Sequence, residues 1–126
     1  MLMKKTIYLK AGSCLSAPSV LIEIARESNF KLRRRVAFNP ASPKPLLRAL
    51  ARDKNKEVRR AVALNPSTPD NVRANLAQDW SPDVRFAVAE SSQTPPVILR
   101  ELMLDANPYV VRRARQSLER QAVNRQ

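Results

Sequence analysis

The sequence predicts an all-α protein, a short α-solenoid of about four two-helix repeats with a period of 26 residues. Two observations support this fold class. The segments RRRVAFNPASP (33–43), RRAVALNPSTP (59–69) and RFAVAESSQTP (85–95) resemble one another and begin 26 residues apart. Within each repeat the apolar residues recur at helical spacing. A pair of helices of about ten residues cannot bury its apolar face alone, whereas stacked pairs cover one another.

The repeats are expected to span most of the chain, because equivalent residues return 26 positions apart. Examples are the columns Asn39, Asn65, Ser91 and Ser117; Asp53, Asp79 and Asp105; and Leu32, Val58, Val84 and Val110. The expected organisation is an N-terminal cap (1–16), four repeats (17–118, divided at about 17–40, 41–66, 67–92 and 93–118) and the end of a capping helix with a tail (119–126). A strand-like and a helical conformation are both open for residues 1–13.

The first helix of each repeat is expected to begin at a Ser-Pro or Thr-Pro pair, with Ser or Thr as the N-cap and Pro as the first helical residue. These pairs are Ser42-Pro43, Thr68-Pro69 and Thr94-Pro95, and Ala17-Pro18 takes their place one residue out of step. Apolar residues follow, including Leu21 and Ile24, Leu46, Leu47 and Leu50, and Ile98, Leu99 and Leu102. In the third repeat Arg73 replaces an expected apolar residue.

The second helix of each repeat is expected to begin at an Asn or Ser N-cap, namely Asn29, Asn55, Ser81 and Asn107. Pro82 and Pro108 then occupy the first helical position. Its buried face reads Val58, Ala61, Val62 and Val84, Ala87, Val88. Two of these helices are expected to end at Asn39-Pro40 and Asn65-Pro66, with Asn in the left-handed cap conformation. Residues 108–122 read as one longer capping helix, in which Ala114 and Arg115 depart from the repeat pattern.

The composition excludes several kinds of site. The 126 residues include no His, one Gly and one Cys. The lack of His excludes His-based nucleophilic catalysis and His-ligated metal, and one Gly excludes a Gly-rich phosphate loop. Cys14 alone cannot form an internal disulfide or a cysteine metal cluster. Because the Asp column recurs with the repeat, it indicates structure rather than catalysis. We therefore expect no enzymatic activity, no cofactor and no metal.

The sequence also bears on location. No apolar run approaches the roughly 18 residues of a membrane span. The apolar stretch between Lys5 and Lys10 is too short for the core of a secretory signal, which needs about 7–15 residues. A single cysteine is typical of a reducing compartment. We therefore expect a cytoplasmic protein that does not interact with a membrane.

The run from Val58 to Pro66 (VRRAVALNP), with Thr68-Pro69 and an apolar helix ending near Asp79, resembles the repeat of the leucine-rich repeat variant family, a HEAT-like helical-repeat solenoid family. The resemblance implies a right-handed superhelix of short α- and 3₁₀-helices, so one helix of each pair here is expected to be partly 3₁₀. The best-known type carries an N-terminal cysteine-ligated iron–sulfur cluster. With only Cys14, this chain is not expected to hold one.

Arginines recur in the second helices as two columns. Successive helical residues lie about 100° apart, which puts Arg33, Arg59 and Arg85 at the rim of the core and Arg34, Arg60 and Arg112 on the outer side. The rim column is expected to pair with the Asp column, within a repeat or between neighbours. For the outer column a solvated face and a binding role are both open. Phe86 stands in the outer column, and Trp80 lies in the preceding turn.

The charge and the repeat together suggest a function. The chain has 23 Lys and Arg against 11 Asp and Glu, a net charge of +12. We expect a binding module whose basic face engages a polyanion, first of all a nucleic acid backbone, either DNA or RNA. An adaptor for an acidic protein or peptide on the same face is the alternative. A small-molecule substrate is not expected. The candidate partner-binding residues are Arg34, Arg60, Phe86, Arg112, Trp80, Arg33, Arg59 and Arg85. Trp80 and Phe86 can equally be structural.

Overall fold

The computed structural model describes residues 2–125, and this part of the chain is all helical, without a strand. The helices are α1 (Leu2–Gly12), α2 (Pro18–Ile24), α3 (Phe30–Phe38), α4 (Lys44–Leu50), α5 (Lys56–Leu64), α6 (Asp70–Leu76), α7 (Pro82–Glu90), α8 (Pro96–Leu102) and α9 (Pro108–Asn124). The predicted all-α class is confirmed. The N-terminal cap is the helix α1, and the longer capping helix predicted over 108–122 is α9.

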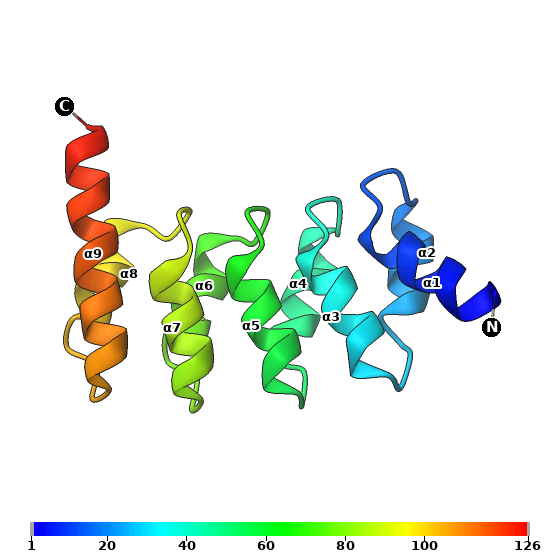
Figure 1. The fold of residues 1–126 in the computed structure, drawn as a ribbon, viewed down its shortest axis with the longest axis horizontal. Helices are drawn as coiled ribbons and strands as arrows, with labels where there is room; N and C mark the ends of the chain where they lie inside the picture. Colours follow the sequence, from blue (N-terminus) through cyan, green and yellow to red (C-terminus); the bar gives the residue numbers. More distant parts are fainter. Residues whose placement is uncertain (1, 126) are drawn as a thin grey trace.

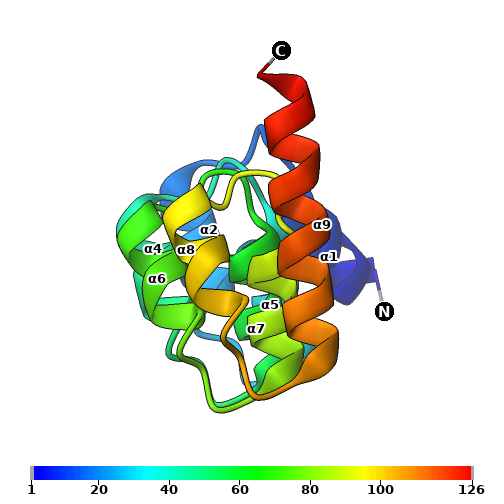
Figure 2. The same ribbon diagram turned by 90° about the vertical axis from the view of Figure 1, so that its left-hand side faces the viewer.

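The helices form an α-solenoid of two layers (Figures 1 and 2). One layer consists of α3, α5, α7 and α9, which pack side by side more extensively than any other helices. The other layer consists of the shorter helices α2, α4, α6 and α8. At the N-terminal end α1 packs on α3 and continues the first layer, while α9 runs beyond its neighbours at the C-terminal end. The predicted repeat solenoid is confirmed.

The core lies between the two layers and consists of the predicted faces. Val58, Ala61 and Val62 of α5 are fully buried, and so are their counterparts in α7. From the other layer, Leu21, Leu47 and Leu99 are fully buried against them. Removing such side chains from water contributes about 1.5–3 kcal/mol each, which is what holds helices of seven to nine residues in place.

The predicted Ser and Thr N-caps of the first helices are wrong. Helices α4, α6 and α8 have Pro43, Pro69 and Pro95 as N-cap residues in extended backbone, without a side-chain cap. The hydroxyls of Ser42, Thr68 and Thr94 instead donate to the carbonyl oxygens of Val36, Val62 and Val88, at 2.6–2.7 Å. These carbonyls lie in the last turn of the preceding helix, where helical partners run out. The hydroxyl therefore closes the helix before it, not the one after it.

The N-caps of the second helices are confirmed at three of four positions. The side chains of Asn29, Asn55 and Asn107 each accept a hydrogen bond from the backbone N–H two residues later, at 2.8–2.9 Å. Ser81 is the N-cap residue of α7 but makes no side-chain cap bond. Pro82 and Pro108 begin α7 and α9 as predicted, because their fixed φ suits the first helical position.

The left-handed Asn caps are also wrong. Asn39 and Asn65 end their helices in extended backbone (φ −74° for both), and no non-glycine residue of the described chain has a positive φ. Their side chains bind the previous repeat instead. Asn65 Nδ2 donates to the carbonyl oxygens of Ala37 and Asn39, both at 2.8 Å, while its Oδ1 accepts the N–H of Ser67. Asn39 binds Ala11 and Ser13 in the same way, so this ladder joins successive turns.

The third repeat lacks the asparagine of this ladder, and a different residue makes the equivalent hydrogen bonds. Ser91 stands at the ladder position, and Arg73 stands where neighbouring repeats have a core leucine. Arg73 is 0% exposed, and its Nη1 and Nη2 donate to the carbonyl oxygens of Ala63 (3.0 Å) and Asn65 (2.7 Å). Nη1 also donates to Ser91 Oγ at 2.7 Å. One arginine thus fills the leucine position and does the hydrogen bonding of the missing asparagine.

The 3₁₀ helix expected from the family resemblance is not present in residues 2–125. The short helices are α-helical, and bonds to the third residue back form at the first turn of α2, α6 and α8 and in the backbone after the last turn. Examples are the N–H groups of Arg52 and Asp53, which donate to the carbonyls of Ala49 and Leu50. This tightening closes the helix and leads into the next turn.

Candidate polyanion-binding surface

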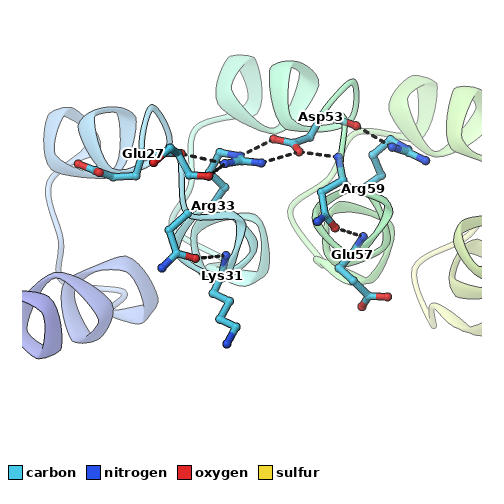
Figure 3. Close-up of polar contacts among 9 residues, drawn as sticks. Glu27, Lys31, Arg33, Asp53, Glu57 and Arg59 are labelled. Carbon is cyan, nitrogen blue, oxygen red and sulfur yellow. Dashed lines mark hydrogen bonds and ion pairs between the residues drawn. The ribbon is translucent and has the colours of Figure 1, made fainter.

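The rim arginines join each repeat to the next. Arg33, Arg59 and Arg85 each donate from Nε and Nη2 to both carboxylate oxygens of an aspartate twenty residues later, over 2.7–3.3 Å. The aspartates are Asp53, Asp79 and Asp105. Figure 3 shows Arg33 reaching the carboxylate of Asp53 in the next repeat, and Arg59 reaching the backbone carbonyl of Asp53. Of the two predicted pairings, the side-chain pairing between neighbouring repeats is the one that forms.

The remaining groups of each fork bind the turn. Arg59 Nη1 donates to the backbone carbonyl oxygen of Asp53 at 2.7 Å. The Arg59 guanidinium is therefore bound both by the turn before its own helix and, through Asp79, by the turn of the next repeat. The Asp53 carboxylate in turn accepts the N–H of Asn55. Burial would raise the pKa of Asp53, but its hydrogen bonds with Arg33 and Asn55 outweigh burial and leave that pKa below its usual range. Arg33 and Arg59 are 7% and 5% exposed, so little of either side chain faces solvent.

Two members of the outer column lie together. Arg34 of α3 and Arg60 of α5 line one hollow of about 270 Å³, which we call the α3–α5 hollow. Its other cations are Lys31 and Arg35, and its remaining lining residues are Tyr8, Phe38 and Glu57. Figure 3 shows Lys31 and Glu57 pointing the same way, away from the Arg–Asp forks. The hollow is therefore separate from the buried Arg–Asp ion pairs.

The other two members of the column lie elsewhere. Phe86 is half-buried and packs against the hydrophobic core. Arg112 is exposed and lines another hollow with Arg115 at the C-terminal end of the solenoid. The column therefore does not form one continuous ladder: the structure groups Arg34 with Arg60 and leaves Phe86 and Arg112 out of that group.

Trp80 lies over a fork rather than in the α3–α5 hollow. Its ring centroid is 5.2 Å from the guanidinium carbon of Arg59, within cation–π range. The side chain is nevertheless 78% exposed, because only one part of the ring covers the arginine. Together with Leu104, which is 87% exposed, it lines a shallow hollow between the third and fourth repeats.

Five residues that line the α3–α5 hollow were not predicted from the sequence: Tyr8, Lys31, Arg35, Phe38 and Glu57. Arg35 Nε donates to the backbone oxygen of Tyr8 at 3.2 Å, and its guanidinium carbon lies 4.3 Å from the centroid of the Tyr8 ring. A signal was present, because Arg35 stands where the next two repeats have the core residues Ala61 and Ala87. Its side chain has room only because α1 lies beside α3 in place of a full repeat.

The charge is distributed unevenly along the solenoid. Residues 1–60 contain fifteen of the 23 cations and four of the 11 acids. Residues 61–107 contain three cations and six acids, and two of those cations are the buried Arg73 and the fork residue Arg85. An exposed ion pair of Lys56 with Asp83 (2.7 Å) lies at the boundary, and its hydrogen bond lowers the pKa of Asp83. The α3–α5 hollow therefore lies in the basic half.

No three His, Cys, Asp or Glu side chains in the described part of the chain are grouped so that they could hold a metal ion. No helix between residues 2 and 125 combines the length and apolar character needed to cross a membrane. Cys14 is exposed and free.

Comparisons with known proteins add no relatives: no family model, curated protein or solved structure matches this chain. The resemblance to the leucine-rich repeat variant family therefore stays a prediction from the repeat residues.

Proposed function

We propose that the protein is a non-enzymatic binding module that holds a nucleic acid backbone on the cations of the α3–α5 hollow. The supporting observation is the contrast between two classes of arginine. Arg33 and Arg59 are buried in forks with aspartates, whereas Arg34 and Arg60 form no ion pair within the described residues and stand around an open hollow. Guanidinium groups that lack a carboxylate partner are well suited to binding phosphates.

The arrangement favours backbone recognition over base-specific recognition. Four cations, Lys31, Arg34, Arg35 and Arg60, surround one hollow, and phosphate contacts of this kind position a nucleic acid without reading its sequence. Glu57 lies among them and repels phosphate on one side, so the backbone is expected to follow the α3 side of the hollow. A cytoplasmic location, supported by the single cysteine, is part of this proposal.

The proposal is tested by comparing two double Arg→Glu variants that make the same change in charge on different faces of the protein. Arg34→Glu/Arg60→Glu alters the α3–α5 hollow, while Arg48→Glu/Arg52→Glu alters two exposed arginines beside the groove between α4 and α6. Both double variants have the same net charge. Fluorescence anisotropy at about 50 mM salt with a labelled oligonucleotide should show that only the first variant loses binding. Loss in the second variant alone would place the nucleic acid on the opposite layer and contradict the proposal.

An acidic protein or peptide on the same face is the second candidate. The observation that favours it is the exposure of two aromatic side chains there, Tyr8 at 41% and Phe38 at 43%, because aromatic residues are enriched in protein interfaces. A protein partner would leave oligonucleotide binding weak in wild type, and saturable binding of a Glu-rich peptide would replace it.

A further inference from the structure

We propose that the α3–α5 hollow binds single-stranded nucleic acid, with one base stacked on the ring of Phe38 and the neighbouring phosphates bound by Arg34, Arg60 and Lys31. This inference rests on the proposed function and specifies which form of nucleic acid is bound. It starts from a combination of groups, an exposed phenyl ring within a ring of cations.

The spacing on α3 places charge and ring on one stripe. Lys31, Arg34 and Phe38 stand at i, i+3 and i+7, so they lie along the same side of the helix. Seven residues of helix span about 10 Å at 1.5 Å per residue. Lys31 and Arg34 therefore come before Phe38 on this side of α3, and Arg60 on α5 lines the same hollow.

Phe38 is the ring best placed for stacking. The Tyr8 ring already has the Arg35 guanidinium over it at 4.3 Å, so one of its faces is occupied. Among residues 2–125 no cation lies over the ring of Phe38, which is 43% exposed although it ends a helix that packs against the core. A base–aromatic stack is independent of sequence, because every base has a π-face. The half-exposed phenyl ring would gain burial from such a stack.

A single strand fits these groups better than a duplex does. Bases in a duplex are stacked inside the helix, and bringing one out costs a few kcal/mol. A hollow of about 270 Å³ has room for one small planar group and not for a double helix. The larger groove between α4 and α6, about 420 Å³, also has arginines at its edge, but its lining includes no aromatic residue. The hollow beside Trp80 does contain an aromatic ring, but its arginine, Arg85, is paired with Asp105, and Asp79 and Glu101 also line it. The α3–α5 hollow combines an exposed ring with arginines that form no ion pair within the described residues.

The test compares three ligands of equal phosphate number with the whole protein: a labelled 12-nucleotide single strand, an abasic strand of the same length, and a duplex with a matching number of phosphates. Wild type is expected to bind the single strand about 5- to 150-fold more tightly than the abasic strand, the range that one stacked base contributes. Phe38→Ala should lose the same factor for the single strand only. Phe38→Tyr should restore it, and Tyr109→Ala, at an exposed aromatic residue outside the hollow, should change nothing.

A spectroscopic variant gives an independent measurement. Trp80 is the only tryptophan, so Phe38→Trp/Trp80→Phe moves the single tryptophan into the hollow. Saturating single strand should quench its fluorescence, and the abasic strand should not. Equal affinity for all three ligands, with no effect of Phe38→Ala but loss on Arg34→Glu/Arg60→Glu, would overturn the stacking inference and keep the proposed function. Absence of binding to all three at about 50 mM salt would overturn both.

Discussion

The buried Arg73 allows a sharp test of how the repeats are joined. It lies at a leucine position, is 0% exposed and forms no direct ion pair with a described residue; burial lowers its pKa, and the charge of Asp70 only partly opposes that shift. Its donors serve the carbonyls of Ala63 and Asn65, as Asn65 Nδ2 serves those of the previous repeat. If Arg73 and Ser91 together replace a Leu–Asn pair, then exchanging both residues should restore the regular ladder.

The expected magnitudes follow from the hydrogen bonds. Arg73→Leu alone leaves the carbonyl of Ala63 without its side-chain donor and weakens the bonding of Asn65; a buried unpaired group costs about 1–3 kcal/mol. Ser91→Asn alone adds volume and a second set of donors beside the guanidinium, and overpacking costs about 1–3 kcal/mol. The double variant Arg73→Leu/Ser91→Asn should recover the wild-type stability, because the new amide reaches the same carbonyls and leucine fills the core.

The measurement is a double-mutant cycle from urea unfolding followed by circular dichroism, with unchanged m-values as the condition for comparison. Because the double variant should recover wild-type stability, the coupling energy should equal the sum of the two single costs, about 2–6 kcal/mol. Ser91→Ala serves as the control, since it removes the Arg73–Ser91 hydrogen bond and the long bond from the N–H of Gln93 (3.4 Å), and should cost about 1 kcal/mol. Additive single effects, within about 0.5 kcal/mol, would refute the view that Arg73 substitutes for the missing asparagine.

Three further predictions concern the Arg–Asp ion pairs and the hydrogen bonds of Asn65. Asp79→Ala should destabilise the protein by about 3 kcal/mol in thermal unfolding, because Arg59 is left buried and unpaired, whereas Lys56→Ala at the exposed pair should leave the melting temperature nearly unchanged. Stability should fall as the pH drops below about 4, since the pKa of Asp53 is lower in the folded than in the unfolded chain; Asp53→Asn should flatten this part of a pH titration of the unfolding free energy. Asn65→Ala should cost about 2 kcal/mol in urea unfolding, with faster hydrogen exchange in the turn between α5 and α6, while Asn75→Ala on the exposed side of α6 should not.

Much of the fold can be predicted from the sequence because the same pattern of apolar and polar residues recurs in each repeat. The 26-residue return of Val58 and its counterparts identifies the buried faces, and the recurring Arg and Asp columns indicate a pairing. The partner of each arginine was not readable, because Asp53 lies six residues before Arg59 in the chain but pairs with Arg33 of the previous repeat in space. The sequence pattern identifies the Arg and Asp columns, whereas the stacking of successive repeats determines which arginine pairs with which aspartate.

The misread caps have a common physical origin. Ser42 and Asn39 were assigned the local capping roles that these residue types usually have. Both side chains instead bind carbonyl oxygens of other segments: Ser42 binds α3, and Asn39 binds the end of α1 and the turn after it. For Asn39 the partner is the preceding turn of the solenoid, which lies next to its own turn. For Ser42 it is the carbonyl of Val36, six residues earlier, which lies in the last turn of α3.

The candidate surface was only half predictable. Arg34 and Arg60 follow from the helical spacing, and they do share a hollow. Tyr8 comes from a segment outside the repeat, so no periodicity could place its ring beside Arg35. The predicted continuation through Phe86 and Arg112 fails because an apolar side chain at that position is drawn into the core and α9 lies at the end of the solenoid.

The salt dependence of oligonucleotide binding tests the central claim most directly. Single-strand binding loses about 0.7 in the slope of log K against log salt for each phosphate neutralised. Four cations line the α3–α5 hollow, which predicts a slope of about −3 for wild type and about −1.4 for Arg34→Glu/Arg60→Glu, whose two remaining cations are Lys31 and Arg35. A wild-type slope near zero, or a slope that is the same in the variant, would contradict the assignment of these arginines to a nucleic acid backbone.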